Sequence, residues 1–161
     1  MTATLRAISY LAPGHGRPVW ELAILLHDER RVRRRIIPLA HGDEVLVDFP
    51  EPVTLEDRGA LELADGRLVE VIAGEEKLYE VRGRDTTHLM QLAWHIGNRH
   101  AKAQLERDAS GDRILILRDP VLRDMLLGLG ARLTDVSEPF HPLEGAYHHG
   151  HRENHALLYR S

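Results

Sequence analysis

The chain has 161 residues, no cysteine and a formal net charge of −4, and 43% of its residues are apolar. The apolar share is enough for a folded core, whereas the lack of cysteine excludes a disulfide framework and is typical of a reducing compartment. The negative charge disfavours general binding to nucleic acid. Residues 1–16 do not resemble a secretory signal peptide, and no stretch approaches the roughly 20 apolar residues that cross a bilayer. We therefore expect a cytoplasmic protein with no membrane partner.

Short alternating segments dominate the first half of the sequence. Turn residues such as Pro13-Gly14 and Asp65-Gly66 separate segments in which apolar and polar residues alternate or in which short apolar runs occur. Several short strands at this spacing are typical of a small β-domain. We expect an all-β N-terminal domain over residues 1–74. Its strands are predicted over residues 5–10, 19–26, 44–49, 61–63 and 67–73.

Two helix signals mark the second half. Asp85 or Thr86 can cap a helix that Gly97 ends, because a side-chain oxygen accepts from free backbone N–H groups and glycine tolerates the terminal conformation. Asp119-Pro120 starts a second helix, which Gly128 and Gly130 end. Strands are predicted around these helices over residues 76–81, 103–107, 113–117 and 132–136. The resulting order β-α-β-β-α-β predicts a ferredoxin-like domain over residues 75–140.

The predicted fold class is therefore α+β, with an all-β domain, a ferredoxin-like βαββαβ domain and a C-terminal tail over residues 141–161. The tail contains Pro142, Gly145 and Gly150, and we expect it to be flexible. Two units of about 70 residues each are small for independent stability, which favours a dimer.

Histidines gather in this tail. Five of the eleven histidines lie in the last 21 residues, and His148, His149 and His151 fall within four positions. Neutral imidazole is a common ligand for borderline transition metals, and short histidine-rich tracts are typical of metal binding. Without cysteine, any such site uses nitrogen and oxygen donors. The alternatives are an inert solvated tail or a purification tag, and the interruptions in the run argue against a tag.

The motif His95-Ile96-Gly97-Asn98-Arg99-His100 is the second candidate. His95 falls in the last turn of the predicted helix, where it can interact with the helix dipole. His100 falls in the following connection and can point outward. Composition alone favours a solvated or hydrogen-bonded histidine over a ligand at His100. One histidine also cannot form a site without partners from the tail or from a second subunit.

No sequence motif predicts catalysis. The chain lacks a glycine-rich phosphate loop and a Gly-x-Ser-x-Gly elbow, and in His151-Arg152-Glu153-Asn154-His155 the glutamate is one position too late for a zinc-protease motif. A run of arginines over residues 30–35 could bind an acidic protein or phosphates. It is also compatible with a solvated strand in which Val32, Ile36 and Ile37 face inward.

The chain resembles the urease accessory nickel metallochaperones, the UreE family. The resemblance rests on residues 95–100, and it extends to five further segments that bring it to nearly the whole chain. These segments are Arg30 to Arg35, Leu39 to Asp48, residues 66–71, Asp119 to Leu129, and Gly145-Ala146-Tyr147 with the histidine-rich end.

The resemblance implies a nickel carrier, not an enzyme, that supplies Ni²⁺ for assembly of the urease active site. It implies a homodimer in which the two His100 side chains face each other and tail histidines complete the site, for which we favour His148, His149 and His151. Zn²⁺ or Cu²⁺ can compete for such donors. The implied partners are the urease apoprotein complex and its GTPase accessory protein, and the implied role of the first domain is to bind a protein or peptide.

Two other functions remain open at this point. One is a metal-independent module that binds a protein or RNA, although the sequence lacks an RNP-type aromatic pattern. The other is a metal-dependent hydrolase, for which the sequence offers no positioned general base.

Overall fold

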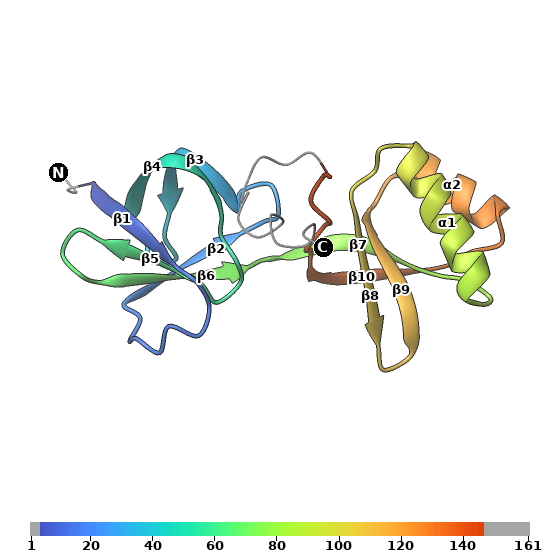
Figure 1. The fold of residues 1–161 in the computed structure, drawn as a ribbon, viewed down its shortest axis with the longest axis horizontal. Coiled ribbons are helices and arrows are strands. Elements are labelled where there is room, and N and C mark those ends of the chain that lie inside the picture. Colours follow the sequence, from blue (N-terminus) through green and yellow to red (C-terminus); the bar gives the residue numbers. More distant parts are fainter. Residues whose placement is uncertain (1–3, 147–161) are drawn as a thin grey trace, which may run out of the picture.

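The computed structural model describes residues 4–146 and contains two separate β-sheets that lie side by side (Figure 1). The first sheet is built from residues 5–73 and the second from residues 75–139. Two helices pack on the second sheet only. The α+β class expected from the sequence is therefore confirmed.

The first sheet has six strands in the order β2-β6-β5-β1-β4-β3. Their bounds are β1 Leu5–Leu11, β2 Glu21–Leu25, β3 Arg31–Pro38, β4 Glu44–Thr54, β5 Ala60–Leu63 and β6 Leu68–Ala73. The sheet is curled, and the Ala40 N–H, just after β3, donates to the Leu22 carbonyl oxygen of β2 at 2.9 Å. His41 also pairs with the buried Glu21 carboxylate, with 2.6 Å between Nδ1 and Oε2. These two contacts link the outer strands of the sheet.

Side chains that point inward at every second position of each strand form the core of this sheet. In β2, Ala23 and Leu25 are buried, whereas Leu22 and Ile24 point outward and are exposed. Successive side chains of a strand point to opposite faces, so the apolar run at 19–26 supplies both faces of the sheet rather than the core alone.

Strand β3 differs from the sequence expectation at one position. Val32 and Ile37 are buried as expected, but Ile36 is 54% exposed. The pairing of β3 with β4 shifts between Val32 and Arg34, which marks a bulge. The extra residues lie on β4, where residues 49–52 lie opposite a single residue of β3. Ile36 and Ile37 are neighbours in an extended strand, so only one of them can face inward, and Ile36 points to solvent.

The second sheet and its helices form the predicted ferredoxin-like unit. Strand β7 is followed by α1, β8, β9, α2 and β10, and the antiparallel sheet has the order β10-β7-β9-β8. The bounds are β7 Glu75–Arg82, α1 Thr86–Asn98, β8 Ala103–Asp108, β9 Gly111–Leu117, α2 Pro120–Gly128 and β10 Arg132–Pro139. Apolar residues of both helices, including Leu92, Ile96, Leu122 and Leu126, bury one face of this sheet.

Both helices start as the sequence predicts. The Asp85 carboxylate accepts from the His88 N–H at 2.8 Å, and the Asp119 carboxylate accepts from the N–H groups of Val121 and Leu122. The end of α1 is where the prediction is wrong. The helix continues through Gly97 to Asn98, and His100 rather than the glycine adopts the left-handed conformation that follows it.

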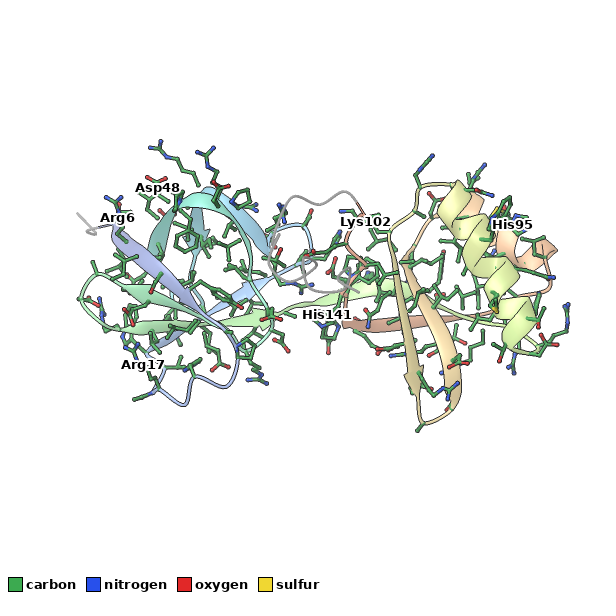
Figure 2. All side chains as sticks on the ribbon, viewed as in Figure 1. Arg6, Arg17, Asp48, His95, Lys102 and His141 are labelled. Carbon is green, nitrogen blue, oxygen red and sulfur yellow. The ribbon has the colours of Figure 1, made fainter. Side chains whose placement is uncertain are left out.

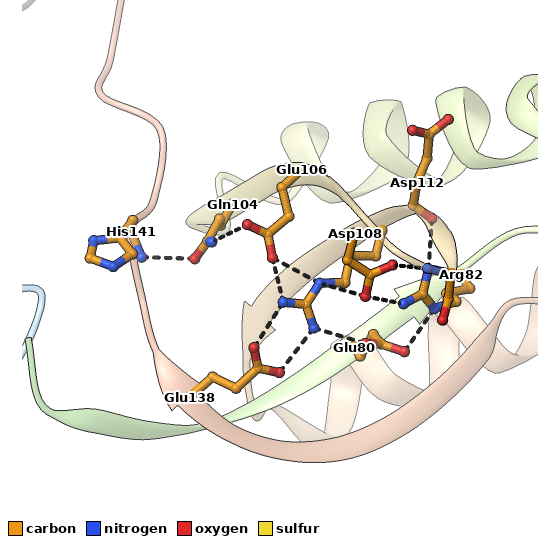
Figure 3. Close-up of polar contacts among 10 residues, drawn as sticks. Glu80, Arg82, Gln104, Glu106, Asp108, Asp112, Glu138 and His141 are labelled. Carbon is orange, nitrogen blue, oxygen red and sulfur yellow. Dashed lines mark hydrogen bonds and ion pairs between the residues drawn. The ribbon is translucent and has the colours of Figure 1, made fainter.

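The helix-free face of the second sheet carries a network of ion pairs, shown in Figure 3. Arg113 pairs with Glu106, with Glu80 at 2.9 Å and with Glu138 at 2.8 Å. Arg82 pairs with Glu80 and Asp108. The hydrogen bond from Arg82 holds the pKa of the Asp108 carboxyl below its usual range. This face therefore combines charge pairs with a small apolar cluster of Leu78, Leu115 and Phe140, whereas the face beneath the helices is apolar.

The two sheets contact each other through a small group of residues, which we call the joint. His27, in the turn between β2 and β3, has its Nδ1 2.7 Å from Oε1 of Glu76, and its backbone N–H donates to Oε2 of the same carboxylate at 2.9 Å. Lys102 Nζ lies 3.3 Å from His27 Nε2. Arg30 donates to the carbonyl oxygen of Phe140, which follows β10. Figure 2 shows Lys102 and His141 in this region between the two sheets.

Candidate metal centre

His100 lies immediately after α1 in a turn that gives its side chain an unusual position. The His100 N–H donates to Gly97 O at 3.0 Å, and the Ala101 N–H donates to Ile96 O at 3.4 Å. These two bonds form a Schellman motif, in which the residue at the position of His100 is usually glycine. The φ angle of His100 is 54°, in the left-handed region. A non-glycine residue in that region costs free energy, and such residues cluster at functional sites.

The ring nitrogens sort the described histidines into two groups. In the first group, a ring nitrogen lies within hydrogen-bond distance of a described residue; the members are His15, His27, His41 and His88. In the second group, neither ring nitrogen has such a partner among residues 4–146; the members are His95, His100 and His141. A metal ligand needs an available ring nitrogen. The second group offers both nitrogens, His15 and His41 still offer Nε2, and His27 and His88 have both nitrogens engaged.

His88 illustrates the first group. The Arg84 N–H donates to its Nδ1 at 3.0 Å, so Nε2 carries the proton and donates to the Leu129 carbonyl oxygen at 2.8 Å. The side chain is buried and joins the start of α1 to the end of α2. His88 is therefore a structural histidine, which the sequence alone does not distinguish from a ligand.

An apolar surface surrounds His100. Met90, Trp94 and Leu105 are 66%, 67% and 49% exposed, and we call these three residues the apolar strip. His100 lines a cavity of about 350 Å³ together with Ala93 and Leu105. A second cavity, beside Met90, is lined by the same two residues, so Met90 and Leu105 of the apolar strip form one continuous surface with His100. The His95 ring packs edge-on against Trp94 at 5.6 Å.

The predicted tail ligands His148, His149 and His151 lie outside the described residues. The start of the tail is described, and it lies against the strand that follows His100. The Leu143 N–H donates to the Ala103 carbonyl oxygen at 2.8 Å, and the His141 N–H donates to Gln104 Oε1 at 2.8 Å. Leu143 also lines the His100 cavity. Leu143, five residues before His148, therefore lies beside the His100 cavity, and the next residue, Glu144, contacts the Thr54 hydroxyl of β4 at 3.3 Å.

His141 belongs to the second group, although the sequence did not single it out. Partial burial lowers the pKa of its imidazole, and the nearby charge of Arg30 lowers it further, so the neutral ring is favoured. Its availability depends on contacts that are remote in sequence, which no local motif reveals. His141 lines the cavity at the joint, together with Arg30 and Lys102.

The other sequence candidates give simpler results. Within residues 4–146, no group of three or more histidine, aspartate or glutamate side chains is arranged to hold a metal ion. The arginine run lies on the outer strand β3, where Arg33, Arg34 and Arg35 are exposed and none has an ion pair with a described residue. No helix in the described part of the chain combines the length and apolarity needed to cross a membrane.

Comparison with known proteins identifies the relatives of this chain. Residues 76–158 match the model of the UreE urease accessory protein C-terminal domain. The urease accessory protein UreE of Mesorhizobium japonicum is 54% identical over 148 residues, covering 91% of this chain and 74% of that protein. The UreE proteins of Brucella anthropi and Rhizobium meliloti are 51% and 49% identical, covering 93% and 92% of this chain and 84% and 96% of those proteins. The chain therefore belongs to the UreE family of urease accessory proteins.

Proposed function

We propose that this chain carries Ni²⁺ for urease assembly and binds the ion between two copies, through both His100 side chains and tail histidines. Members of its family are accessory proteins and not enzymes. The observation that carries the proposal is the conformation of His100, an exposed imidazole placed outside its helix by a positive φ.

The apolar strip supports a homodimer. Met90 and Trp94 are four residues apart on α1, so they lie on the same helix face, and Leu105 of β8 lines the same cavity as Met90. Large exposed apolar side chains that cluster mark interaction surfaces. If a two-fold axis passes through this surface, the residues beside it meet their own copies. Such an arrangement brings the two His100 side chains together.

The proposed site needs donors beyond those of one His100. The described residues of one chain supply no metal-holding group of three, so the remaining donors come from the second copy and from His148, His149 and His151. About five residues separate Leu143 from His148, which reach at most about 17 Å when extended. Because Leu143 lines the His100 cavity, this reach includes the neighbourhood of His100.

An imidazole site of this kind suits a carrier. Nitrogen donors bind Ni²⁺, and also Cu²⁺ and Zn²⁺, so selectivity depends on geometry and metal supply. Ligands donated by a tail can be replaced one at a time by those of a receiving protein, which avoids release of the free ion. We propose the urease apoprotein complex and its GTPase accessory protein as the receivers, and the cytoplasm as the location.

We further propose that residues 1–74 and 75–140 are two domains with different roles. Strand β6 ends at Ala73 and β7 begins at Glu75, so the proposed boundary falls between the two sheets. The second domain would hold the metal and form the dimer, and the first would bind a protein partner.

Calorimetric titration of the full chain with Ni²⁺, with the molecular mass measured in parallel, tests the site. We expect one tight ion per two chains. His100→Ala should abolish tight binding of that ion. His95→Ala is the matched control, because the His95 ring nitrogens likewise have no hydrogen-bond partner among the described residues and its ring packs only against Trp94. Deletion of residues 148–161 should lower affinity or stoichiometry but leave the dimer. A tight ion that survives in His100→Ala would refute the assignment.

A further inference from the structure

The joint between the two sheets buries a positive charge that lacks a counter-ion. Arg30 is only 5% exposed, and its guanidinium donates to the Phe140 carbonyl oxygen. Its Nη1 is buried and has no hydrogen-bond partner among the described residues. No carboxylate among residues 4–146 lies within 4.0 Å of the Arg30 guanidinium. Buried charges are normally paired, because an unpaired one loses its hydration without compensation.

The nearest carboxylates are already engaged elsewhere. Both oxygens of Glu76 contact His27, one through the ring and one through the backbone N–H. Asp57 Oδ1 accepts from the Ala73 N–H at 2.8 Å. These two charges act on Arg30 only from a longer distance, where their attraction is weaker. The guanidinium is therefore left with donors to offer.

A second cation faces the same space. Lys102 is exposed, contacts the His27 ring at 3.3 Å, and forms no ion pair with any described residue. Arg30, Lys102 and His141 line a cavity of about 590 Å³. This volume is typical of sites for small organic ligands.

Besides Asp57, three carboxylates line the cavity wall, and these four groups limit how much negative charge it accepts. Asp28, Glu56 and Glu144 are all exposed, and Glu144 accepts from the Thr54 hydroxyl at 3.3 Å. Exposed carboxylates are solvated and screened, whereas the Arg30 charge is not. The attraction for an anion is therefore strongest at Arg30 and weakens toward solvent.

We propose that this cavity binds a small molecule bearing an oxyanion, either a carboxylate or a phosphate, which Arg30 and Lys102 hold together. Guanidinium and ammonium groups form charge-assisted hydrogen bonds to both kinds of oxyanion. The inference goes beyond nickel carriage and does not depend on it. Arg30 belongs to the turn before β3, and Lys102 lies two residues after His100, so the ligand connects the first sheet to the loop that carries His100.

The two lysines of the chain provide a matched pair of variants. Lys77 is exposed on β7 and does not line the cavity, whereas Lys102 does. The full, metal-free chain is titrated with inorganic phosphate and, separately, with acetate at constant ionic strength, and backbone amide chemical shifts are followed. We expect saturable shifts at the amides of Arg30, Lys102 and His141. Lys102→Met should weaken the affinity about tenfold, as expected for loss of one charge-assisted bond, and Lys77→Met should leave it unchanged.

Arg30→Met tests the buried partner, and it should abolish the saturable shifts. Lys102 is exposed, so the Lys102→Met result remains decisive even if Arg30→Met does not fold. Saturation by phosphate alone identifies a phosphate-bearing ligand, and saturation by acetate alone identifies a carboxylate. Absence of saturable shifts with both probes, or equal effects of Lys102→Met and Lys77→Met, overturns the proposal.

Discussion

The two helices of the second sheet end in the same backbone motif but use it differently. After α2, Gly130 has a φ of 83°, its N–H donates to Leu127 O at 3.0 Å, and the Ala131 N–H donates to Leu126 O at 3.0 Å. After α1, His100 takes the position of Gly130, and Ala101 takes that of Ala131. The first motif has the residue that favours it, and the second has a histidine.

The surroundings of the two ends explain the difference. A Cβ atom on Gly130 would lie 2.7 Å from Arg84 Nη1, and the His88 ring donates to Leu129 O beside it. The end of α2 is therefore packed into the fold. The end of α1 projects His100 into an open cavity beside the apolar strip. The end of α2 therefore contributes to stability, whereas the end of α1 has a strained backbone conformation that exposes the His100 side chain.

The largest expected effect is on nickel binding. His100→Gly keeps the backbone motif of α1, and indeed favours it, but removes the imidazole from both copies. We expect the tight Ni²⁺ affinity to fall at least a thousandfold, or about 4 kcal/mol. Competition with a chromophoric chelator measures the loss. Circular dichroism of the same sample checks the fold, so that retained affinity in a folded variant would contradict the role of His100.

The end of α2 should respond in its stability instead. His88→Leu leaves the Arg84 N–H and the Leu129 carbonyl oxygen without partners, and we expect it to lower the free energy of unfolding by about 3 kcal/mol. Urea denaturation measures this change. His95→Leu is the control on the same helix, because its ring nitrogens have no partner in the described structure. Similar losses in the two variants would mean that the His88 bridge is unimportant.

Two glycines at the C-terminal ends of the helices should differ in the sign of their effects on stability. Gly130→Ala forces a Cβ into the left-handed region, so we expect a loss of about 1–2 kcal/mol. Gly97 lies within α1, and a Cβ there has no heavy atom within 4 Å. Gly97→Ala should therefore stabilise the chain by up to about 1 kcal/mol, since alanine is the better helix former. Thermal unfolding of both variants measures the two changes, and changes of the same sign would contradict the difference between the two helix ends.

The smallest expected effect is the stability of His100→Gly itself. Relief of the positive φ should raise the free energy of unfolding by about 1 kcal/mol, in the direction opposite to the loss of nickel affinity. Urea denaturation in the presence of a chelator gives this value without any contribution from bound metal. A variant that is less stable than the parent chain would show that the His100 ring contributes to the fold.

Local sequence rules predict the starts of both helices but not the end of α1. Asp85 and Asp119-Pro120 were predicted correctly as helix starts, because a cap depends on residues within a few positions of each other. Gly97 was wrongly expected to end α1, because glycine is the usual terminal residue. The useful signal was instead Ile96 with Ala101, the apolar pair that accompanies a Schellman motif.

The sequence predicts the positions of the strands better than it predicts which strands pair. Alternation located β1, β2 and β6, but it does not indicate that β1 pairs with β4 and β2 with β6 in parallel. The joint is similarly remote in sequence, since His27 and Glu76 are 49 residues apart. His100 was singled out from a motif, whereas the availability of the His141 ring follows only from tertiary contacts.

The hydrogen bond between Leu143 and Ala103 determines the effective concentration of the His148 imidazole near His100. It fixes one end of the segment that leads to His148, so that imidazole is confined within about 17 Å of Leu143 by covalent geometry. One group in a sphere of that radius corresponds to an effective concentration on the order of tens of millimolar. At the proposed site, a receiving protein at a lower concentration must therefore displace a tethered imidazole whose effective concentration exceeds its own.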